Sequence, residues 1–247
     1  MNTKKKTGKR IVICFIVLLL MIICSFFIYV SDYYHANDIA IEEASIAGNV
    51  DISNINGTLV IDPGNAATAL IFYPGGKVEY TAYEPLMTKI ARKGILCILP
   101  EMPFNLAVFD INAAEAYISA YPEIQHWYVG GHSLGGSMAA SYASKNSDRV
   151  EGLILLASYS TADISSSGMR VLSLYGSKDG VMNEKSYQNN KSNLPANFTE
   201  IVLQGGNHAG FGCYGPQQGD GEADITFEQQ QTVTAQTVAE FVFQQGI

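Results

Sequence analysis

One serine in the chain stands in a pattern that could make it a nucleophile. The string 131-GHSLG-135 follows directly on the apolar run 127-WYVG-130 and precedes a helix-forming segment. A sharp turn from a strand into a helix would expose the Ser133 hydroxyl, and Gly131 and Gly135 would prevent side-chain clashes where the chain passes close to itself. The alternative is a glycine-rich turn without chemistry, so the remaining sequence must supply a base and an acid.

A nucleophilic serine needs a histidine as its general base. His208 lies in 204-QGGNHAGFG-212, directly after the apolar run 199-TEIVL-203, where the carboxyl end of a strand would open onto a loop. We expect the side chain of His132, beside the serine, to pack or to form hydrogen bonds elsewhere. The other two histidines lie in the N-terminal connector and at the start of a strand, and these are His35 and His126. His208 is therefore the predicted base.

The acid that orients the base should follow the serine and precede the histidine in the chain. Asp179 lies in 177-SKDG-180, after the apolar run 171-VLSLY-175, and Asp163 follows the preceding strand as the second choice. Both loops should open at the same edge of the sheet, and we favour Asp179. Three acidic residues beyond the histidine break this order and could instead bind Ca²⁺ or form a solvated loop, which we favour; these are Asp220, Glu222 and Asp224.

A tetrahedral intermediate also needs two backbone donors for its oxyanion. The N–H of Leu134, directly after the serine, is one candidate. The second should come from the loop after the strand 69-ALIFY-73, where the glycines of 74-PGG-76 allow the backbone to approach an acyl oxygen closely. We predict Gly76 as this donor, with Lys77 as the alternative.

The elements that would position these residues alternate between short apolar strands and helical segments, which indicates an α/β fold. The strand cores are continuous apolar runs, which are typical of a parallel sheet buried on both faces. Ligands bind beyond the carboxyl ends of such strands. The expected strands are 49–53, 58–61, 69–73, 95–99, 127–130, 150–157, 171–175 and 199–203. The expected helices are 80–93, 111–120, 134–145, 182–192 and 227–244.

Composition limits the class of protein. The chain has 247 residues, of which 47% are hydrophobic and 15% charged, so it can bury the core of one medium-sized domain. Its net charge of −8 gives no indication of nucleic-acid binding. We expect no metal ion and no organic cofactor, since the predicted chemistry requires neither.

The segment 11–30 contains no charged residue and would span about 30 Å as a helix, which matches the hydrocarbon core of a bilayer. Basic residues before it favour a cytoplasmic N-terminus. A cleaved signal peptide is the alternative, although 30–40 offers no good cleavage site. We expect a cytoplasmic segment 1–10, a signal anchor 11–30, a connector 31–45 and a catalytic domain 46–247 outside the cytoplasm, on a cell membrane crossed once.

Together the motifs resemble those of α/β-hydrolases of the serine esterase type, over about residues 58–247. The motifs that carry this resemblance, in the family's order and spacing, are 73-YPGG-76, 131-GHSLGG-136, 177-SKDG-180 and 205-GGNH-208. The resemblance implies a mostly parallel, doubly wound sheet of about eight strands and a triad of Ser133, His208 and Asp179. Proline stands before the oxyanion glycines, where many relatives have histidine.

Two loops, 100-PEMPFN-105 and 210-GFGCYGPQQGDG-221, are similar to those of a small bacterial membrane-anchored subgroup of that family. Phe104 and Asn105, in the first loop, are candidates for lining the substrate pocket.

We expect a serine hydrolase that cleaves a carboxylic ester through an acyl-enzyme. Hydrolysis of an amide or thioester, acyl transfer to an alcohol, and a catalytically silent binding domain remain alternatives. The segment between the strands 150–157 and 171–175 is short, so little or no lid is expected there. An open site suits small, water-soluble esters, whereas the anchor suits a membrane-derived ester. The sequence does not indicate an oligomeric state.

Overall fold

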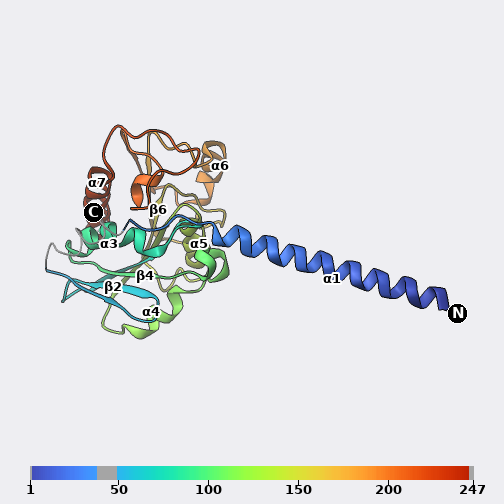
Figure 1. Ribbon diagram of the computed structural model, residues 1–247. Coiled ribbons are helices and arrows are strands. Elements are labelled where there is room, and N and C mark those ends of the chain that lie inside the picture. Colours follow the sequence, from blue (N-terminus) through green and yellow to red (C-terminus); the bar gives the residue numbers. More distant parts are fainter. Residues whose placement is uncertain (1, 38–48, 245–247) are drawn as a thin grey trace. The chain divides into compact units, whose positions relative to one another are not determined.

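The computed structural model describes residues 2–37 and 49–244 and divides into two compact units, Met1–Tyr33 and Tyr34–Ile247. The second unit, drawn with the rest of the chain in Figure 1, contains one eight-stranded sheet. Its strand order is β1-β2-β4-β3-β5-β6-β7-β8. The strands are β1 (Asp51–Asn54), β2 (Thr58–Asp62), β3 (Thr68–Tyr73), β4 (Leu96–Pro100), β5 (His126–His132), β6 (Gly152–Leu156), β7 (Arg170–Gly176) and β8 (Thr199–Leu203).

The sheet is mostly parallel. The six strands from β4 across to β8 run parallel to their neighbours, whereas β1 pairs with β2, and β2 with β4, in the antiparallel direction. β1 and β2, which the sequence predicts as strands at 49–53 and 58–61, thus form an antiparallel pair at the edge of the sheet. All residues of β3 and β6 are buried, as expected for strands covered on both faces.

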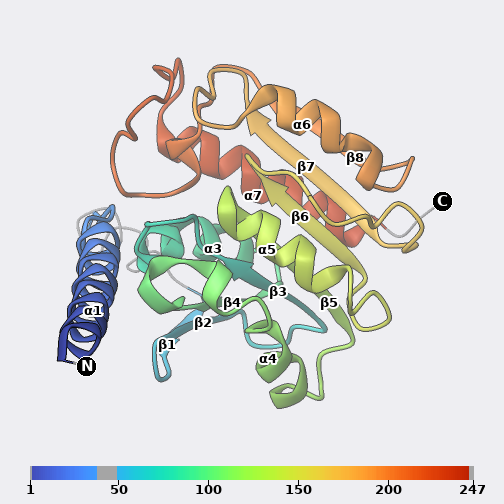
Figure 2. The ribbon, with the colours of Figure 1, turned by 90° about the vertical axis from the view of Figure 1, so that its right-hand side faces the viewer.

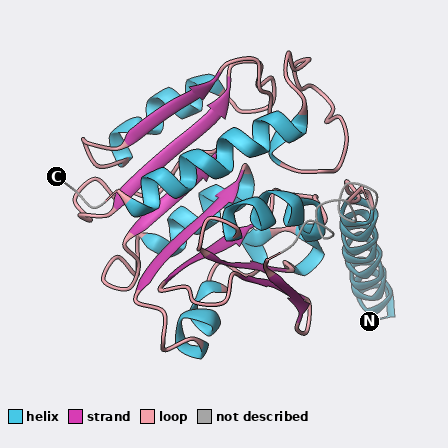
Figure 3. Ribbon diagram, turned by 90° about the vertical axis from the view of Figure 1, so that its left-hand side faces the viewer, coloured by secondary structure: helices cyan, strands magenta, loops and turns pink. Residues whose placement is uncertain are grey.

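Helices cover both faces of the sheet, which Figures 2 and 3 show from opposite sides. One face packs against α3 and α7, and the other against α4 and α5, in two separate apolar clusters. The helix α6 lies on the same face as α5. Tyr187 of α6 is hydrogen-bonded to Ser173 of β7, and the residues on either side of Ser173 point to the opposite face, toward α3 and α7. These helices are α3 (Glu84–Ala91), α4 (Ala114–Ala120), α5 (Leu134–Ala143), α6 (Glu184–Asn190) and α7 (Phe227–Phe243).

The expected helix over 80–93 is divided. It begins as a 3-10 turn, η1 (Tyr80–Tyr83), and continues as α3 from Glu84. Pro85 stands at the start of α3, where its missing N–H costs no hydrogen bond. The segment 157–169, between β6 and β7, contains no helix, so no lid domain is inserted there.

The first unit contains the helix α1 (Asn2–Ser31). Its portion Val12–Ser31 has a mean hydropathy of 3.1, and most of its apolar side chains are exposed. By length and composition this helix could cross a membrane, and a signal sequence would have the same properties.

Candidate active site

Ser133 occupies a strained turn between β5 and α5. Its backbone has φ 52° and ψ −122°, a conformation that residues with a side chain rarely adopt and that costs on the order of 1–3 kcal/mol. β5 ends at His132 and α5 begins at Leu134, so the serine forms the whole turn. The side chain is only half-buried, which leaves the hydroxyl accessible at the carboxyl end of β5.

Glycines are required on both sides of this turn. A Cβ atom at Gly131 would lie 2.6 Å from the carbonyl oxygen of Tyr73, and one at Gly135 would collide with the carbonyl oxygens of Tyr73 and Pro74. The turn is therefore packed against the end of β3. This close approach explains both glycines of the motif.

The strained turn is held by hydrogen bonds from the neighbouring strand. Ser133 N–H donates to the Leu156 carbonyl at 2.9 Å, and the buried Ser158 hydroxyl donates to the Ser133 carbonyl at 2.6 Å. Ser158 follows Ala157, which itself has a positive φ of 47°. Sequence reasoning did not identify Ser158, because its contact depends on the pairing of β5 with β6.

Asp179 and His208 are joined at the same edge of the sheet. Asp179 follows β7 and His208 follows β8, and His208 Nδ1 lies 2.9 Å from Asp179 Oδ2. The side chain of His208 is only 1% exposed and that of Asp179 only 3%. Asp179 Oδ1 accepts the N–H groups of Val181 and Met182 at 2.9 and 2.8 Å, so the carboxylate is fixed in orientation.

The other nitrogen of His208 is unoccupied. Nε2 is buried and has no hydrogen-bond partner among the described residues, so the structure brings His208 to Asp179 but forms no bond from His208 to Ser133. Its ring centre lies 4.4 Å from that of His132, the residue before the serine. The base and the turn are thus in van der Waals proximity through His132.

His132 is a fully buried neighbour of the base. Its Nδ1 lies 2.8 Å from the Tyr83 hydroxyl, which also accepts the Gly75 N–H at 3.0 Å. Burial lowers the pKa of His132 well below its ordinary value, and the adjacent His208 lowers it further. His132 is therefore neutral, and Tyr83 and His132 connect the loop after β3 to His208, the predicted base. No motif in the sequence indicated Tyr83.

The loop after β3 offers one uncommitted N–H group. Gly75 N–H donates to Tyr83, and Lys77 N–H donates to the Asn105 carbonyl at 2.8 Å. The N–H of Gly76 has no partner among the described residues, and a Cβ at Gly76 would lie 2.9 Å from the Leu134 side chain. The two predicted oxyanion donors thus come from adjacent segments.

Phe104 and Asn105 belong to a tight turn beside this loop. They lie in the 3-10 turn η2 (Pro103–Asn105), both with positive φ, 57° and 55°. The Asn105 carbonyl accepts the Lys77 N–H, and Leu106 lies next to the space above Gly76. The Phe104 ring contacts that of Phe109 edge-on at 5.6 Å. The turn thus lies beside the loop that contains Gly76.

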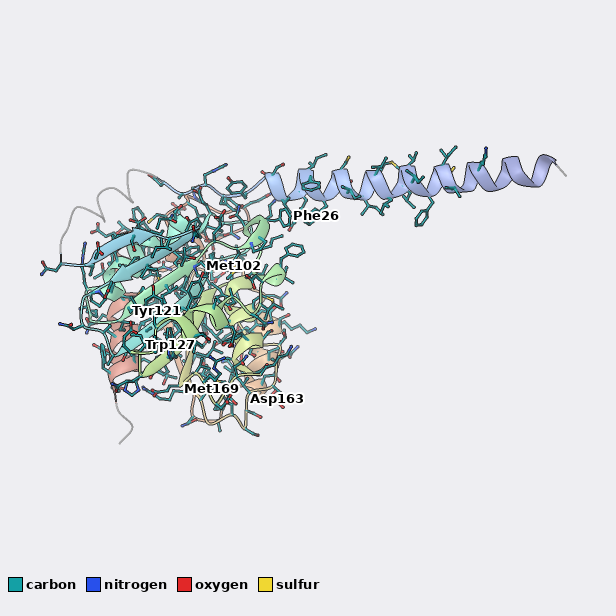
Figure 4. All side chains as sticks on the ribbon, turned by 90° about the horizontal axis from the view of Figure 1, so that it is seen from below. Phe26, Met102, Tyr121, Trp127, Asp163 and Met169 are labelled. Atoms are coloured by element: carbon teal, nitrogen blue, oxygen red, sulfur yellow. The ribbon has the colours of Figure 1, made fainter. Side chains whose placement is uncertain are left out.

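Asp163, the second choice for the acid, lies elsewhere. Figure 4 shows it at the periphery, where its exposed carboxylate accepts the N–H and hydroxyl of Ser165. His208 Nδ1 is bonded to Asp179 instead. Within residues 2–37 and 49–244, no group of three or more His, Cys, Asp or Glu side chains is arranged to hold a metal ion.

The fold and the turn at Ser133 are those of an α/β-hydrolase. The model of the alpha/beta hydrolase family matches residues 69–232, more than half of the chain, so the protein belongs to this family. No curated protein matches the sequence significantly.

Solved structures share the fold at low sequence identity. TT1662 from Thermus thermophilus is 13% identical with a TM-score of 0.58, and the match covers 80% of this chain and 100% of that one. A dienelactone hydrolase from Anabaena variabilis is 14% identical with a TM-score of 0.56, over 78% and 97%. Est1E from Butyrivibrio proteoclasticus is 12% identical with a TM-score of 0.53, over 79% and 99%.

Proposed function

We propose that this protein is a serine hydrolase that cleaves a carboxylic ester through an acyl-enzyme on Ser133. The observation that carries the proposal is the buried hydrogen bond between His208 and Asp179, at the sheet edge where Ser133 forms its strained turn. Nucleophilic catalysis requires three parts, which are a fixed acid, a base with a free nitrogen and an accessible hydroxyl.

In the proposed mechanism His208 Nε2 removes the proton from Ser133 as the hydroxyl oxygen attacks the ester carbonyl. Asp179 keeps Nδ1 protonated and stabilises the imidazolium. The same proton then passes to the departing alcohol, and water repeats the sequence to release the acid. The empty Nε2 is compatible with this role, because hydrogen bonds between base and nucleophile often tighten only when substrate is bound.

The N–H groups of Leu134 and Gly76 would stabilise the oxyanion. Leu134 is the first residue of α5, whose N-terminal dipole also favours negative charge. Gly76 is favoured over Lys77 because the Lys77 N–H is already donated to Asn105. Each donor in such a site contributes about 10²–10³ in kcat.

An ester is the substrate class that the structural relatives suggest. One solved protein of the same fold is Est1E, whose name denotes an esterase-like protein. Another is named as a dienelactone hydrolase. The short 157–169 segment leaves the site without a lid domain, and Phe104 and Asn105 would border the acyl group. Both small soluble esters and lipid-derived esters fit such a site.

We further propose that α1 is an uncleaved signal anchor that holds the hydrolase domain outside the cytoplasm. Its apolar portion, Val12–Ser31, is long enough to cross a bilayer, and basic residues precede it in the sequence.

Hydrolysis of p-nitrophenyl esters of increasing acyl length by the purified full-length protein tests the function. We expect turnover that depends on acyl length and that Ser133→Ala abolishes, whereas Ser141→Ala, in the same helix, retains it. Turnover that persists in Ser133→Ala would exclude the proposed nucleophile. A wild-type protein that cleaves thioesters or amides but no ester would keep the nucleophile and correct the substrate class.

A further inference from the structure

We propose that Asp220 is a positioning residue that clamps the Asp179 loop and the His208 loop together; this inference rests on the proposed hydrolase function. Asp220 belongs to the acidic loop that the sequence suggested as solvated or as a Ca²⁺ site. Its role in the structure is different, because its carboxylate binds backbone N–H groups on both sides of the predicted acid–base pair.

The Asp220 carboxylate accepts four backbone N–H groups. Oδ1 accepts those of Gly180, His208 and Gly221 at 3.0, 3.2 and 2.9 Å. Oδ2 accepts that of Ala209 at 2.8 Å. Hydrogen bonds to an ionised acceptor are stronger than those between neutral groups. The oxygens are therefore committed to the protein's own backbone.

Three of these donors come from two other loops, and Gly221 is the neighbour of Asp220 in the chain. Gly180 is next to Asp179 and follows β7, whereas His208 and Ala209 follow β8. The bridge is closely packed, since a Cβ at Gly180 would lie 2.5 Å from the Gly219 carbonyl oxygen, and one at Gly221 would collide with the Lys178 carbonyl. One carboxylate therefore fixes the separation between the acid and the base.

This contact has a consequence for proton transfer. The groups that face His208 are Asp179 from the loop after β7, the neutral His132 from β5 and the Asp220 carboxylate at its own backbone N–H. Losing the Asp220 contacts would loosen the bond between His208 and Asp179, so the imidazole would be held less often in the orientation that proton transfer from Ser133 needs. The loss should therefore appear in kcat rather than in KM.

The test compares Asp220→Asn with the full-length wild type in detergent. An amide of the same shape is uncharged and cannot accept at one of its two positions. It therefore loses either the Ala209 N–H or those of Gly180, His208 and Gly221, and the bonds that remain are weaker. We expect kcat to fall about 10- to 100-fold with little change in KM, because misplacement by about 1 Å costs this much.

Asp224→Asn is the matched control. Asp224 lies in the same loop and carries the same charge, but its side chain makes an exposed ion pair with Lys178 and accepts none of these N–H groups. We expect this variant to keep the wild-type kcat and KM, since exposed ion pairs contribute little.

Hydrogen exchange provides a readout that does not depend on activity. Asp220→Asn should accelerate exchange in both 177–182 and 205–211, while Asp224→Asn should not. Unchanged exchange together with an unchanged kcat in Asp220→Asn would overturn the clamp, as would equal losses in Asp224→Asn or loss of cooperative unfolding in Asp220→Asn. A wild type without Ser133-dependent turnover would refute the proposed function, and the exchange data would still decide whether Asp220 joins the two loops.

Discussion

At the scale of single residues, the proposed mechanism depends on the hydrogen bonds of the two carboxylate oxygens of Asp179. One oxygen accepts two backbone N–H groups and the other faces His208 Nδ1. The aspartate is therefore held before any substrate arrives, and it holds the histidine ring in turn. Such an arrangement selects the tautomer in which Nε2 can accept a proton from the serine.

The first prediction concerns this aspartate. Asp179→Asn should lower kcat for ester hydrolysis by about 10³- to 10⁴-fold, because the amide favours the wrong tautomer of His208. Asp163→Asn is the control, and steady-state kinetics with one ester should give it the wild-type kcat. If the two variants lose activity equally, Asp179 is not the orienting acid.

A second prediction concerns His132 and pH. Because burial lowers the pKa of His132 in the folded protein, only the unfolded state takes up its proton near the ordinary value of about 6.5. The free energy of unfolding should therefore fall as the pH drops below that value, by up to about 1.4 kcal/mol per pH unit. Urea unfolding of the full-length protein between pH 7 and 5.5 measures this slope.

Two variants isolate the contribution of His132 to this slope. His132→Asn should flatten it, whereas His126→Asn, whose exposed side chain pairs with Glu151, should leave it in place. A slope that survives in His132→Asn would assign the pH dependence to another group.

Much of the candidate site can be predicted from the order of residues along the chain, whereas the remaining residues are identified only by their tertiary contacts. Ser133, Asp179 and His208 each follow an apolar run, which is a local pattern. Tyr83 reaches His132 across 49 positions of sequence, and its hydroxyl has no motif around it. The four N–H groups held by Asp220 likewise come from turns whose approach depends on how β7 and β8 pair.

At the scale of elements, the strand-to-helix turn at Ser133 is the most demanding feature. Its backbone conformation is unfavourable by itself and persists because β3 and β6 hold it from both sides. The expected strands and helices agree with those of the structure to within about three residues. The apolar runs made them predictable, whereas the 3-10 turns have too few residues for a periodic pattern.

The third prediction tests this turn. Gly135→Ala forces a methyl group against two carbonyl oxygens at the end of β3. We expect the free energy of unfolding to fall by about 3 kcal/mol and ester hydrolysis to be lost. Ser141→Ala in the same helix removes only a hydrogen bond to Ser137, and should stay within about 0.5 kcal/mol of the wild type. A stable and active Gly135→Ala would contradict the close packing described for this turn.

At the scale of the whole molecule, an apolar helix and an α/β-hydrolase domain share one chain. The helix carries exposed apolar side chains along Val12–Ser31. Burying that surface in lipid is strongly favourable at about 25 cal/mol per Å². A hydrolase held at a membrane would meet esters that partition into, or are released from, that membrane.

The fourth prediction concerns this anchor. The full-length chain should remain in the membrane fraction after alkaline carbonate extraction, and its N-terminal peptide should be intact by mass spectrometry. Replacing Leu18 and Leu19 by arginine should release it, because each charge at the centre of a span costs about 2.5–3.5 kcal/mol. A soluble wild-type product that begins near residue 35 would instead indicate a cleaved signal peptide.

The most direct test of the central claim is covalent labelling of the full-length protein with a fluorophosphonate, followed by mass spectrometry of the digested adduct. The account predicts one phosphonylated residue, Ser133, with labelling absent in Ser133→Ala and strongly slowed in Asp179→Asn. An unlabelled but folded wild type, or equal labelling of Ser133→Ala, would contradict it.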